Sequence, residues 1–188
     1  MIRSGIAQKA VGFTLPTGTS YQLDNIVLRL FNYNTVTDGT VALLQIYADP
    51  NRGSTSPKGP GTILQSVLFT NPSSRSNVAN NFTFAPDPTT PFTFAANTRY
   101  WLLVDATAGN YTWRSNNTGI TPAGVATFIS PAGYQISNDN GVNYASSTVF
   151  NSFNINATAV PFEFEATGGL VMLGGAWLLH KHLQKKKT

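Results

Sequence analysis

Asn25-Ile26-Val27-Leu28-Arg29-Leu30-Phe31 is the stretch that decides the fold. Within it Ile26, Leu28 and Leu30 are spaced by two, and side chains with that spacing share one face of a β-strand. We therefore predict a strand with one face in an apolar core. No helical periodicity competes with such patterns before residue 165, so the sequence predicts an all-β fold.

A second run, Thr40–Ala48, follows the dipeptide Asp38-Gly39. Because Asp-Gly readily takes the positive φ angles of a hairpin turn, we expect this run to pair with Asn25–Phe31. Asn140-Gly141 predicts another turn, which sets Tyr134–Ser137 against a strand that begins with Val142–Tyr144.

The remaining strand signals are short runs, each bounded by Pro, Gly, Asn or Ser. They are Gly61–Phe69, Asn81–Ala85, Tyr100–Asp105, Asn110–Arg114, Val125–Ser130 and Val149–Ala157. Short strands at regular spacing, with polar loops and no helices between them, favour an antiparallel β-sandwich, jelly-roll-like, over any α/β fold. We assign residues 1–160 to this domain. Loops are expected at Asp49–Pro60 and Pro86–Pro91, where Pro and Gly interrupt any sheet ladder.

The composition fits one polar-surfaced domain with an appendage. The chain has 188 residues, of which only 11% are charged, while 12 Phe, 7 Tyr and 3 Trp supply apolar area to bury. Residues 1–160 carry 8 basic and 6 acidic side chains, so this part has a net charge of +2 out of the chain's +4. A nearly neutral body has no basic stripe for phosphates, which argues against a nucleic-acid partner.

Residues 161–188 form a second segment, in which an uncharged apolar run from Ala166 to Leu179 precedes a lysine-rich end. We predict a short hydrophobic C-terminal helix that contacts the membrane; its assigned residues are Gly168, Gly169, Leu170, Gly174, Gly175, Trp177 and Leu179. The basic stop is formed by Lys181, Lys185, Lys186 and Lys187, which would stay cytoplasmic before processing while the body faces outward.

The apolar run is short for a permanent span. Its 14 residues rise only about 21 Å as a helix, against about 30 Å of hydrocarbon. This length fits a processed hydrophobic segment or a buried helix. A soluble packing helix is the alternative, and the pairs Gly168-Gly169 and Gly174-Gly175 count against it because glycine destabilises a water-exposed helix.

Pro161-Phe162-Glu163-Phe164, the glycine-bearing apolar run and the lysine-rich end follow one another in that order. This arrangement resembles the tripartite sorting signals of the PEP-CTERM class, in the Pro-Phe-Glu variant familiar from cyanobacteria. The resemblance implies that Pro161, Phe162 and Glu163 are recognised by an exosortase, a membrane-embedded cysteine transpeptidase. That enzyme would cleave near the motif and pass the protein to the surface. The commoner Pro-Glu-Pro is replaced here, which leaves the cleavage position open.

A second resemblance covers most of residues 4–160. Ser4–Gln8, Gly12-Phe13-Thr14 and Pro91–Val104 look like the opening and middle signatures of choice-of-anchor domains of type R, with Phe92–Val104 the most distinctive part. That family joins one secreted β-rich domain to varied surface anchors. The resemblance implies an exported protein. Met1-Ile2-Arg3-Ser4 lacks the apolar stretch that export requires, so we expect a start upstream or a trimmed chain.

Catalytic and metal chemistry has few candidates in the body. The chain has no Cys, and its two histidines, His180 and His182, lie in the basic tail. Asp24 and Asp105 could face a cleft as a carboxylate pair, but capping or edge protection is the favoured role. Asp49–Gly53 is only faintly similar to a calcium loop. We predict no enzyme, no cofactor and no metal.

Aromatic side chains offer the best case for ligand binding in the body. A flat platform for sugar rings would use Tyr100, Trp101, Tyr111 and Trp113, with Tyr134 as a further candidate. The favoured interpretation is that Trp101 and Trp113 are core residues, since a sandwich needs large inward side chains.

These observations predict a non-enzymatic, extracytoplasmic protein of the cell envelope or extracellular matrix, sorted by its C-terminal segment. The expected partners are the membrane, an exosortase-like enzyme, and either exopolysaccharide or further copies of the chain. Two alternatives stay open: a carbohydrate-binding module, whose aromatic platform would be exposed, and a filament or surface-layer subunit, whose strand edges would pair between copies.

Overall fold

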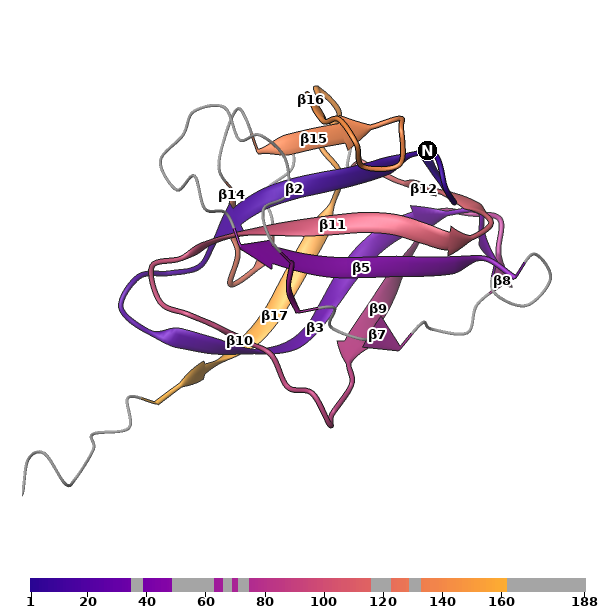
Figure 1. Cartoon of the computed structure of the whole chain (residues 1–188). Coiled ribbons are helices and arrows are strands. Elements are labelled where there is room, and N and C mark those ends of the chain that lie inside the picture. Colours follow the sequence, from indigo (N-terminus) through magenta and orange to yellow (C-terminus); the bar gives the residue numbers. More distant parts are fainter. Residues whose placement is uncertain are drawn as a thin grey trace, which may run out of the picture.

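The computed structural model describes residues 1–34, 39–48, 63–65, 69–70, 75–115, 123–128 and 133–161, which form two large sheets and one small ribbon (Figure 1). The first sheet contains β1 (Ile2–Arg3), β3 (Ser20–Phe31), β7 (Phe69–Thr70), β9 (Asn80–Pro86), β10 (Thr93–Phe94), β12 (Asn110–Trp113), β13 (Ala123–Gly124) and β17 (Phe153–Val160). The second contains β2 (Gln8–Thr14), β5 (Val41–Ala48), β6 (Ile63–Gln65), β11 (Arg99–Ala108), β14 (Thr127–Phe128), β15 (Tyr134–Ser137) and β16 (Ala145–Ser146). The ribbon pairs β4 (Tyr33–Asn34) with β8 (Arg75–Ser76).

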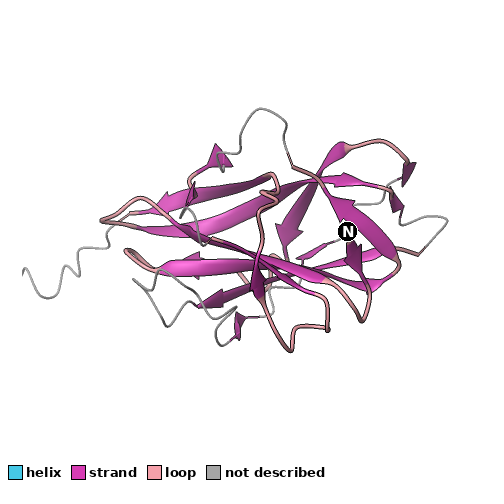
Figure 2. Cartoon of the chain, turned by 90° about the horizontal axis from the view of Figure 1, so that it is seen from above, coloured by secondary structure: helices cyan, strands magenta, loops and turns pink. Residues whose placement is uncertain are grey.

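The predicted all-β class is confirmed for these ranges, in which no helix occurs (Figure 2). The predicted hydrophobic C-terminal helix falls on residues 162–188, outside the described residues. Pairing between strands is antiparallel throughout the described ladders except at β13 and β17, which run parallel. Gly124 in β13 has φ +76°, and a Cβ there would lie 2.0 Å from the carbonyl oxygen of Ile155. Glycine is therefore required for this close parallel contact.

Strand β3 organises the first sheet because both of its edges are paired. One edge pairs with β17 and then β12, and the other pairs with β10 and then β9. Ile26, Leu28 and Leu30 are fully buried on one face, as their spacing predicts. The strand predicted at Asn25–Phe31 is confirmed, and it begins earlier, at Ser20.

A bulge in β3 changes which of its residues face the core. The register with β17 skips Asp24, which has no directly opposite partner. An extra residue shifts the alternation of side chains, so Leu23 and Ile26 are both buried although they are three residues apart. The Asp24 carboxylate accepts a hydrogen bond from Thr158 Oγ1 at 2.9 Å. Asp24 therefore secures the irregular pairing of β3 with β17.

Strand β11 is the centre of the second sheet, between β2 and β5. Tyr100, Leu102 and Val104 point into the main core, and the alternate residues Trp101 and Leu103 lie on the opposite face. All five are buried. Both faces of β11 are thus covered, unlike a strand with one face in water.

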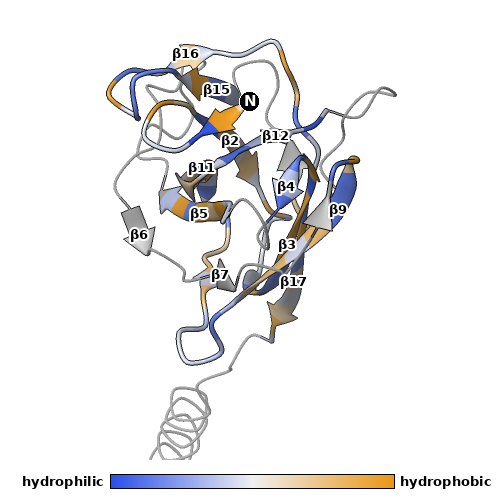
Figure 3. Ribbon diagram, turned by 90° about the vertical axis from the view of Figure 1, so that its right-hand side faces the viewer, coloured by the Kyte–Doolittle hydropathy of each residue, from blue (hydrophilic) through white to orange (hydrophobic). Residues whose placement is uncertain are grey.

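One apolar core lies between the inward faces of the two sheets. Its aromatic rings meet edge to face: Phe92 and Phe94 at 4.9 Å between centroids, Phe94 and Tyr100 at 5.1 Å, and Tyr33 and Tyr111 at 5.4 Å. Such pairs add about 0.5–1.5 kcal/mol each beyond the area they bury. Burial alternates along β5, with Ala42, Leu44 and Ile46 buried, so one face of this strand turns to the core; Figure 3 shows the strand with its hydropathy.

The predicted hairpin between Asn25–Phe31 and Thr40–Ala48 is wrong, because β3 and β5 lie in different sheets. Asn32, with φ 56°, breaks the chain directly after β3 and leads it into β4. Gly39 does take a positive φ of 59°. Alternation identified the buried face of each strand, whereas the partner depends on residues far away in sequence.

Two further strand predictions need correction, and one strand was missed. The run Gly61–Phe69 is not one strand, because its described ends, Ile63–Gln65 and Phe69–Thr70, pair with β5 and β9 in different sheets. The run Val125–Ser130 has described strand residues only at Thr127–Phe128. Strand β2 was missed, because its sequence QKAVGFT mixes polar residues and glycine with apolar ones, yet six of its seven residues are buried.

The other predicted runs are confirmed, Tyr134–Ser137 with the expected ends and the rest with shifted ends, and the turn at Asn140-Gly141 is confirmed by φ angles of 57° and 84°. It joins β15 to β16, which pair antiparallel, although β16 begins at Ala145 and not at the predicted Val142–Tyr144. Pro86–Pro91 includes a described turn in which the Thr90 amide donates to the Asp87 carbonyl at 3.0 Å. The loop expected at Asp49–Pro60 lies outside the described residues.

Replacing Leu28 with alanine tests the central position of β3. Leu28 is 0% exposed, so Leu28→Ala should lower the free energy of unfolding by about 3 kcal/mol, from lost transfer energy and the cavity left behind. Urea titration followed by tryptophan fluorescence measures this change. Gln22→Ala, on an exposed position of the same strand, is the control and should cost less than about 0.5 kcal/mol. Equal effects of the two substitutions would contradict this packing.

Candidate functional site

The four aromatic residues of the predicted sugar platform are buried, so that platform is not present. Tyr100 and Trp113 are each 2% exposed, Tyr111 is 1% exposed and Trp101 is 0% exposed. Tyr100 and Trp101 also point to opposite faces of β11, because neighbouring residues of a strand alternate. They cannot form one flat surface. The favoured interpretation of Trp101 and Trp113 as packed residues agrees with this burial.

The polar ends of Tyr100, Tyr111 and Trp113 have hydrogen-bond partners within the fold, whereas Trp101 Nε1 has none among the described residues. Tyr111 OH donates to the carbonyl of Asp105 at 2.5 Å, and Trp113 Nε1 donates to the carbonyl of Ser152 at 2.7 Å. Tyr100 OH accepts from the Ala95 amide at 2.8 Å. Burial raises the pKa of Tyr111, and it also raises the pKa of Tyr33 to about 12. These side chains therefore have structural roles.

Lys9 and Asn151 form a buried polar pair at the border of the core. Lys9 is 5% exposed and Asn151 is 0% exposed, and Lys9 Nζ donates to Asn151 Oδ1 at 2.9 Å. Asn151 also donates through Nδ2 to the Trp113 carbonyl, and its own carbonyl accepts from Tyr134 OH. The pair ties β2 to the segment before β17, 142 residues away. Burial lowers the pKa of Lys9.

A second polar network covers the outer face of the second sheet. Gln8 Nε2 donates to Asp105 Oδ2 at 2.8 Å, and Tyr144 OH donates to Gln8 Oε1 at 2.8 Å. Burial raises the pKa of Asp105, although its hydrogen bonds from Gln8 and the Ala106 amide oppose that rise. The pKa of Tyr144 is also raised, first by burial and then by the charges nearby. Asp105 is thus held by the fold.

Arg99 and Trp101 lie side by side on the same outer face. The Arg99 guanidinium carbon is 5.3 Å from the centroid of the Trp101 ring, a cation–π distance. Gly12 on the neighbouring strand makes room for them, because a Cβ there would lie 3.0 Å from Arg99 Nη2 and 3.4 Å from Trp101. Both side chains are buried. This contact stabilises the sheet and leaves Trp101 inaccessible to a ligand.

Asp24 and Asp105, the carboxylates proposed to face a cleft, stand on different sheets. Asp24 is exposed and bonded to Thr158, and Asp105 is buried beside Gln8. Neither lines the pocket described next. Within the described ranges no three His, Cys, Asp or Glu residues come together in a way that could hold a metal ion.

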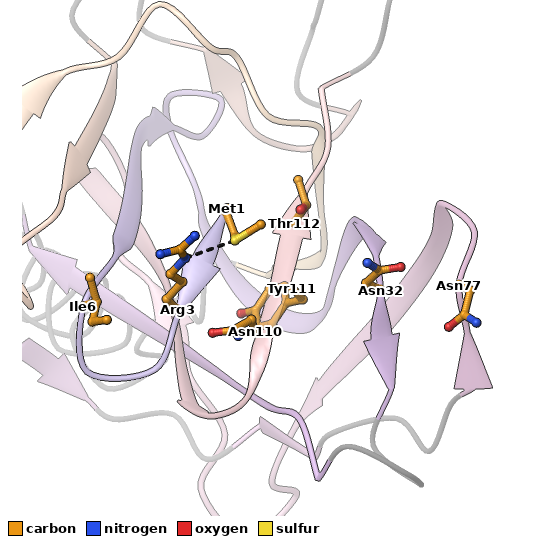
Figure 4. A pocket seen from close by; sticks show the side chains of 8 residues that line it. All are labelled: Met1, Arg3, Ile6, Asn32, Asn77, Asn110, Tyr111 and Thr112. Atoms are coloured by element: carbon orange, nitrogen blue, oxygen red, sulfur yellow. Dashed lines mark hydrogen bonds between the residues drawn. The ribbon is translucent and has the colours of Figure 1, made fainter.

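An open pocket of about 790 Å³, here called the edge hollow, lies where β1 pairs with β12 (Figure 4). Its polar lining comes from Arg3, Asn32, Asn77, Asn110 and Thr112. Met1 and Ile6 add exposed apolar surface, at 57% and 49% exposure, and the buried Tyr111 lies beneath. The volume lies within the range of about 300–1,000 Å³ typical of ligand pockets.

The fold fixes the backbone on both sides of the edge hollow. Arg3 is directly opposite Asn110 in the β1–β12 ladder, so their side chains share one face. A tight turn follows Arg3: Gly5 has φ 68°, and the amides of Ile6 and Ala7 donate to the Arg3 carbonyl at 3.1 and 3.0 Å. Sequence reasoning missed this site because its residues come from separate segments, with no motif linking them.

Of the predicted sorting motif, Pro161 is described and exposed, directly after the end of β17. Phe162 and Glu163 lie outside the described residues, as do the assigned membrane segment and the basic stop. In the part of the chain that is described, no helix is long and apolar enough to span a membrane. No family model matches the chain, and no curated protein or solved structure matches it either.

Substitution of Asn151 tests the buried polar pair. Asn151→Ala leaves Lys9 Nζ and the Trp113 carbonyl without their partner, and each such buried group costs about 1–3 kcal/mol. The free energy of unfolding should therefore fall by about 2–4 kcal/mol in a urea titration. Lys9→Met in the same background should recover part of the loss, since it removes the unpaired amine. If Lys9→Met restores none of the lost free energy of unfolding, the pairing of Lys9 with Asn151 is contradicted.

The same pair predicts a pH dependence. The folded pKa of Lys9 lies below its ordinary 10.5, so between these two values the unfolded chain binds more protons than the folded one. Stability should therefore rise as the pH approaches 10.5, and Lys9→Met should remove that rise. The free energy of unfolding is measured against pH for the original chain and for Lys9→Met. Parallel curves of this free energy for the two proteins would contradict the burial of Lys9.

The turn after β15 predicts an acidic titration. Hydrogen bonds from the backbone and side chain of Asn143 and from Ser137 lower the pKa of Asp139 to about 2. Stability from this group is present above its ordinary 3.8 and is lost as the pH falls through about 2. NMR titration of the Asp139 carboxyl measures the midpoint, which Asn143→Ala should raise. Asp87, whose pKa is lowered by hydrogen bonds from Thr89, is the internal control, and its titration midpoint should not change in Asn143→Ala. A midpoint near 3.8 in the unsubstituted chain would contradict this turn.

Proposed function

We propose that this chain is a non-enzymatic protein of the cell envelope or extracellular matrix, whose folded body is exported and sorted by residues 161–188. Pro161, Phe162 and Glu163 would be the recognition motif for an exosortase-like transpeptidase. The apolar run after them would hold the motif at the membrane, and Lys181, Lys185, Lys186 and Lys187 would keep the end cytoplasmic until cleavage.

The observation that carries this proposal is the position of the motif relative to the described fold. The last residue buried in the described core is Ile155, and β17 ends at Val160, at the periphery of the body (Figure 1). The carbonyl of Val160 accepts from Thr19 Oγ1 at 3.1 Å, and the exposed Pro161 follows. Cleavage after this point would remove none of the described core. A sorting signal needs such a place, because the body must survive its removal.

The arrangement of the two sheets supports a jelly-roll-like β-sandwich as the exported body. Two of the segments that look like choice-of-anchor signatures are neighbours in it: Gly12-Phe13-Thr14 of β2 pairs residue by residue with Arg99–Trp101 of β11, which lies within Pro91–Val104. They form the centre of the second sheet. We propose that the distinctive residues of this resemblance are the ones that build the sheet, while the attached anchor varies.

An intact mass of the protein from its own host tests the proposal. The chain purified from the envelope and from the medium should end near residues 160–164, with or without an added anchor. Replacement of Pro161, Phe162 and Glu163 by alanine should leave the lysine end attached. Thr148→Ala, a change at an exposed position of the body outside the motif, is the control and should be processed normally. A mature mass that includes Lys187 and Thr188 would refute the sorting proposal.

A further inference from the structure

We propose that the edge hollow binds an acidic sugar, with Arg3 pairing with the carboxylate and Asn32, Asn77 and Asn110 bonding the hydroxyls. This inference deepens the proposed function by naming a ligand class for a matrix protein, and it rests on that function only for the source of the sugar.

The polar groups of the edge hollow are available to a ligand. Within the described residues, the side chains of Asn32, Asn77 and Asn110 make no hydrogen bond, and all three are exposed. Arg3 makes one weak contact, from Nε to Met1 Sδ at 3.1 Å, and has no acidic partner in the described part of the chain (Figure 4). Carboxamides both donate and accept hydrogen bonds, which suits neighbouring sugar hydroxyls.

Positive charge gathers around this pocket. Arg114 lies two residues beyond Thr112, so it shares the outward side of that chain, and its guanidinium carbon is 4.5 Å from the Phe31 ring centroid. Arg3 and Arg114 are both exposed, and neither has an acidic partner among the described residues. An anionic ligand therefore meets a favourable potential here.

Arginine and amides select different parts of one ligand. A guanidinium forms paired hydrogen bonds with a carboxylate, which a neutral sugar lacks. The carboxamides bind hydroxyls of any sugar, and Met1 and Ile6 offer exposed apolar surface for the C–H face of a ring. The combination favours a uronic acid within an oligosaccharide over a neutral sugar or a bare anion.

The backbone around the edge hollow is set before a ligand arrives. Arg3 and Asn110 are opposite each other in the β1–β12 ladder, and Ser4 is anchored by its amide to the Gly109 carbonyl at 3.2 Å and by its hydroxyl to the Thr107 carbonyl at 2.9 Å. A preset backbone lowers the ordering cost of binding. The fold thus supplies a prepared site for a small ligand.

Calorimetric titration of the full chain with trigalacturonic acid tests this inference, with galactotriose and inorganic phosphate as the comparison ligands. We expect binding of the acidic trisaccharide at least tenfold tighter than of the neutral one, with an affinity that falls as salt rises. Equal binding of both sugars would overturn the role of Arg3. Phosphate competing at the same concentration as the trisaccharide would overturn the sugar assignment.

Substitutions locate the site. Arg3→Gln should weaken binding of trigalacturonic acid about tenfold or more, and Asn110→Ala about threefold, because a hydrogen bond to a charged group is the stronger of the two. Arg29→Gln removes the same charge from an exposed position outside the pocket and should change the affinity less than twofold. Equal losses in Arg3→Gln and Arg29→Gln would overturn the site. The titration uses purified protein and does not depend on sorting. If the protein binds no acidic sugar, the sorting proposal still stands. If the intact mass refutes sorting, the sugar-binding proposal still stands.

Discussion

Pairing of β3 along both of its edges is the constraint on which the first sheet depends. This strand of 12 residues pairs with β17 and β12 on one side and with β10 and β9 on the other. A strand in that position cannot slip by one residue, since a slip would carry Ile26, Leu28 and Leu30 from the core to the outer face. The chain has no cysteine, so no disulfide assists this register.

The core takes up most of the large aromatic side chains of the described body and leaves few of them for contact with other molecules. The polar ends of Tyr100, Tyr111 and Trp113 form hydrogen bonds with main-chain groups inside the fold. What remains for contact with other molecules is amide-rich and weakly charged, as the composition predicts. The edge hollow brings together amide side chains that make no hydrogen bond within the described residues. It lies where β1 pairs with the edge of β12.

Local pattern predicted the strands better than their partners. Alternating apolar residues identified the buried face of β3, and Asn140-Gly141 identified the turn after β15, because both depend on neighbours in sequence. The partner of Thr40–Ala48 and the division of Gly61–Phe69 between two sheets depend on contacts that no local pattern contains. The burial of Lys9 and Asn151 could not be predicted from the sequence either, because lysine and asparagine usually lie on the protein surface. The sugar platform failed because residue type alone does not tell an inward aromatic from an outward one.

Native-state hydrogen exchange of the folded chain, read by NMR, tests most directly that β3 and β11 are the paired centres of the two sheets. The account predicts that the hydrogen-bonded amides of Ile26–Leu28 and Leu102–Val104 exchange most slowly, only by global unfolding, and that those of the short edge strand Ala145–Ser146 exchange much faster. Exchange at Ile26–Leu28 as fast as at Ala145–Ser146 would contradict the account.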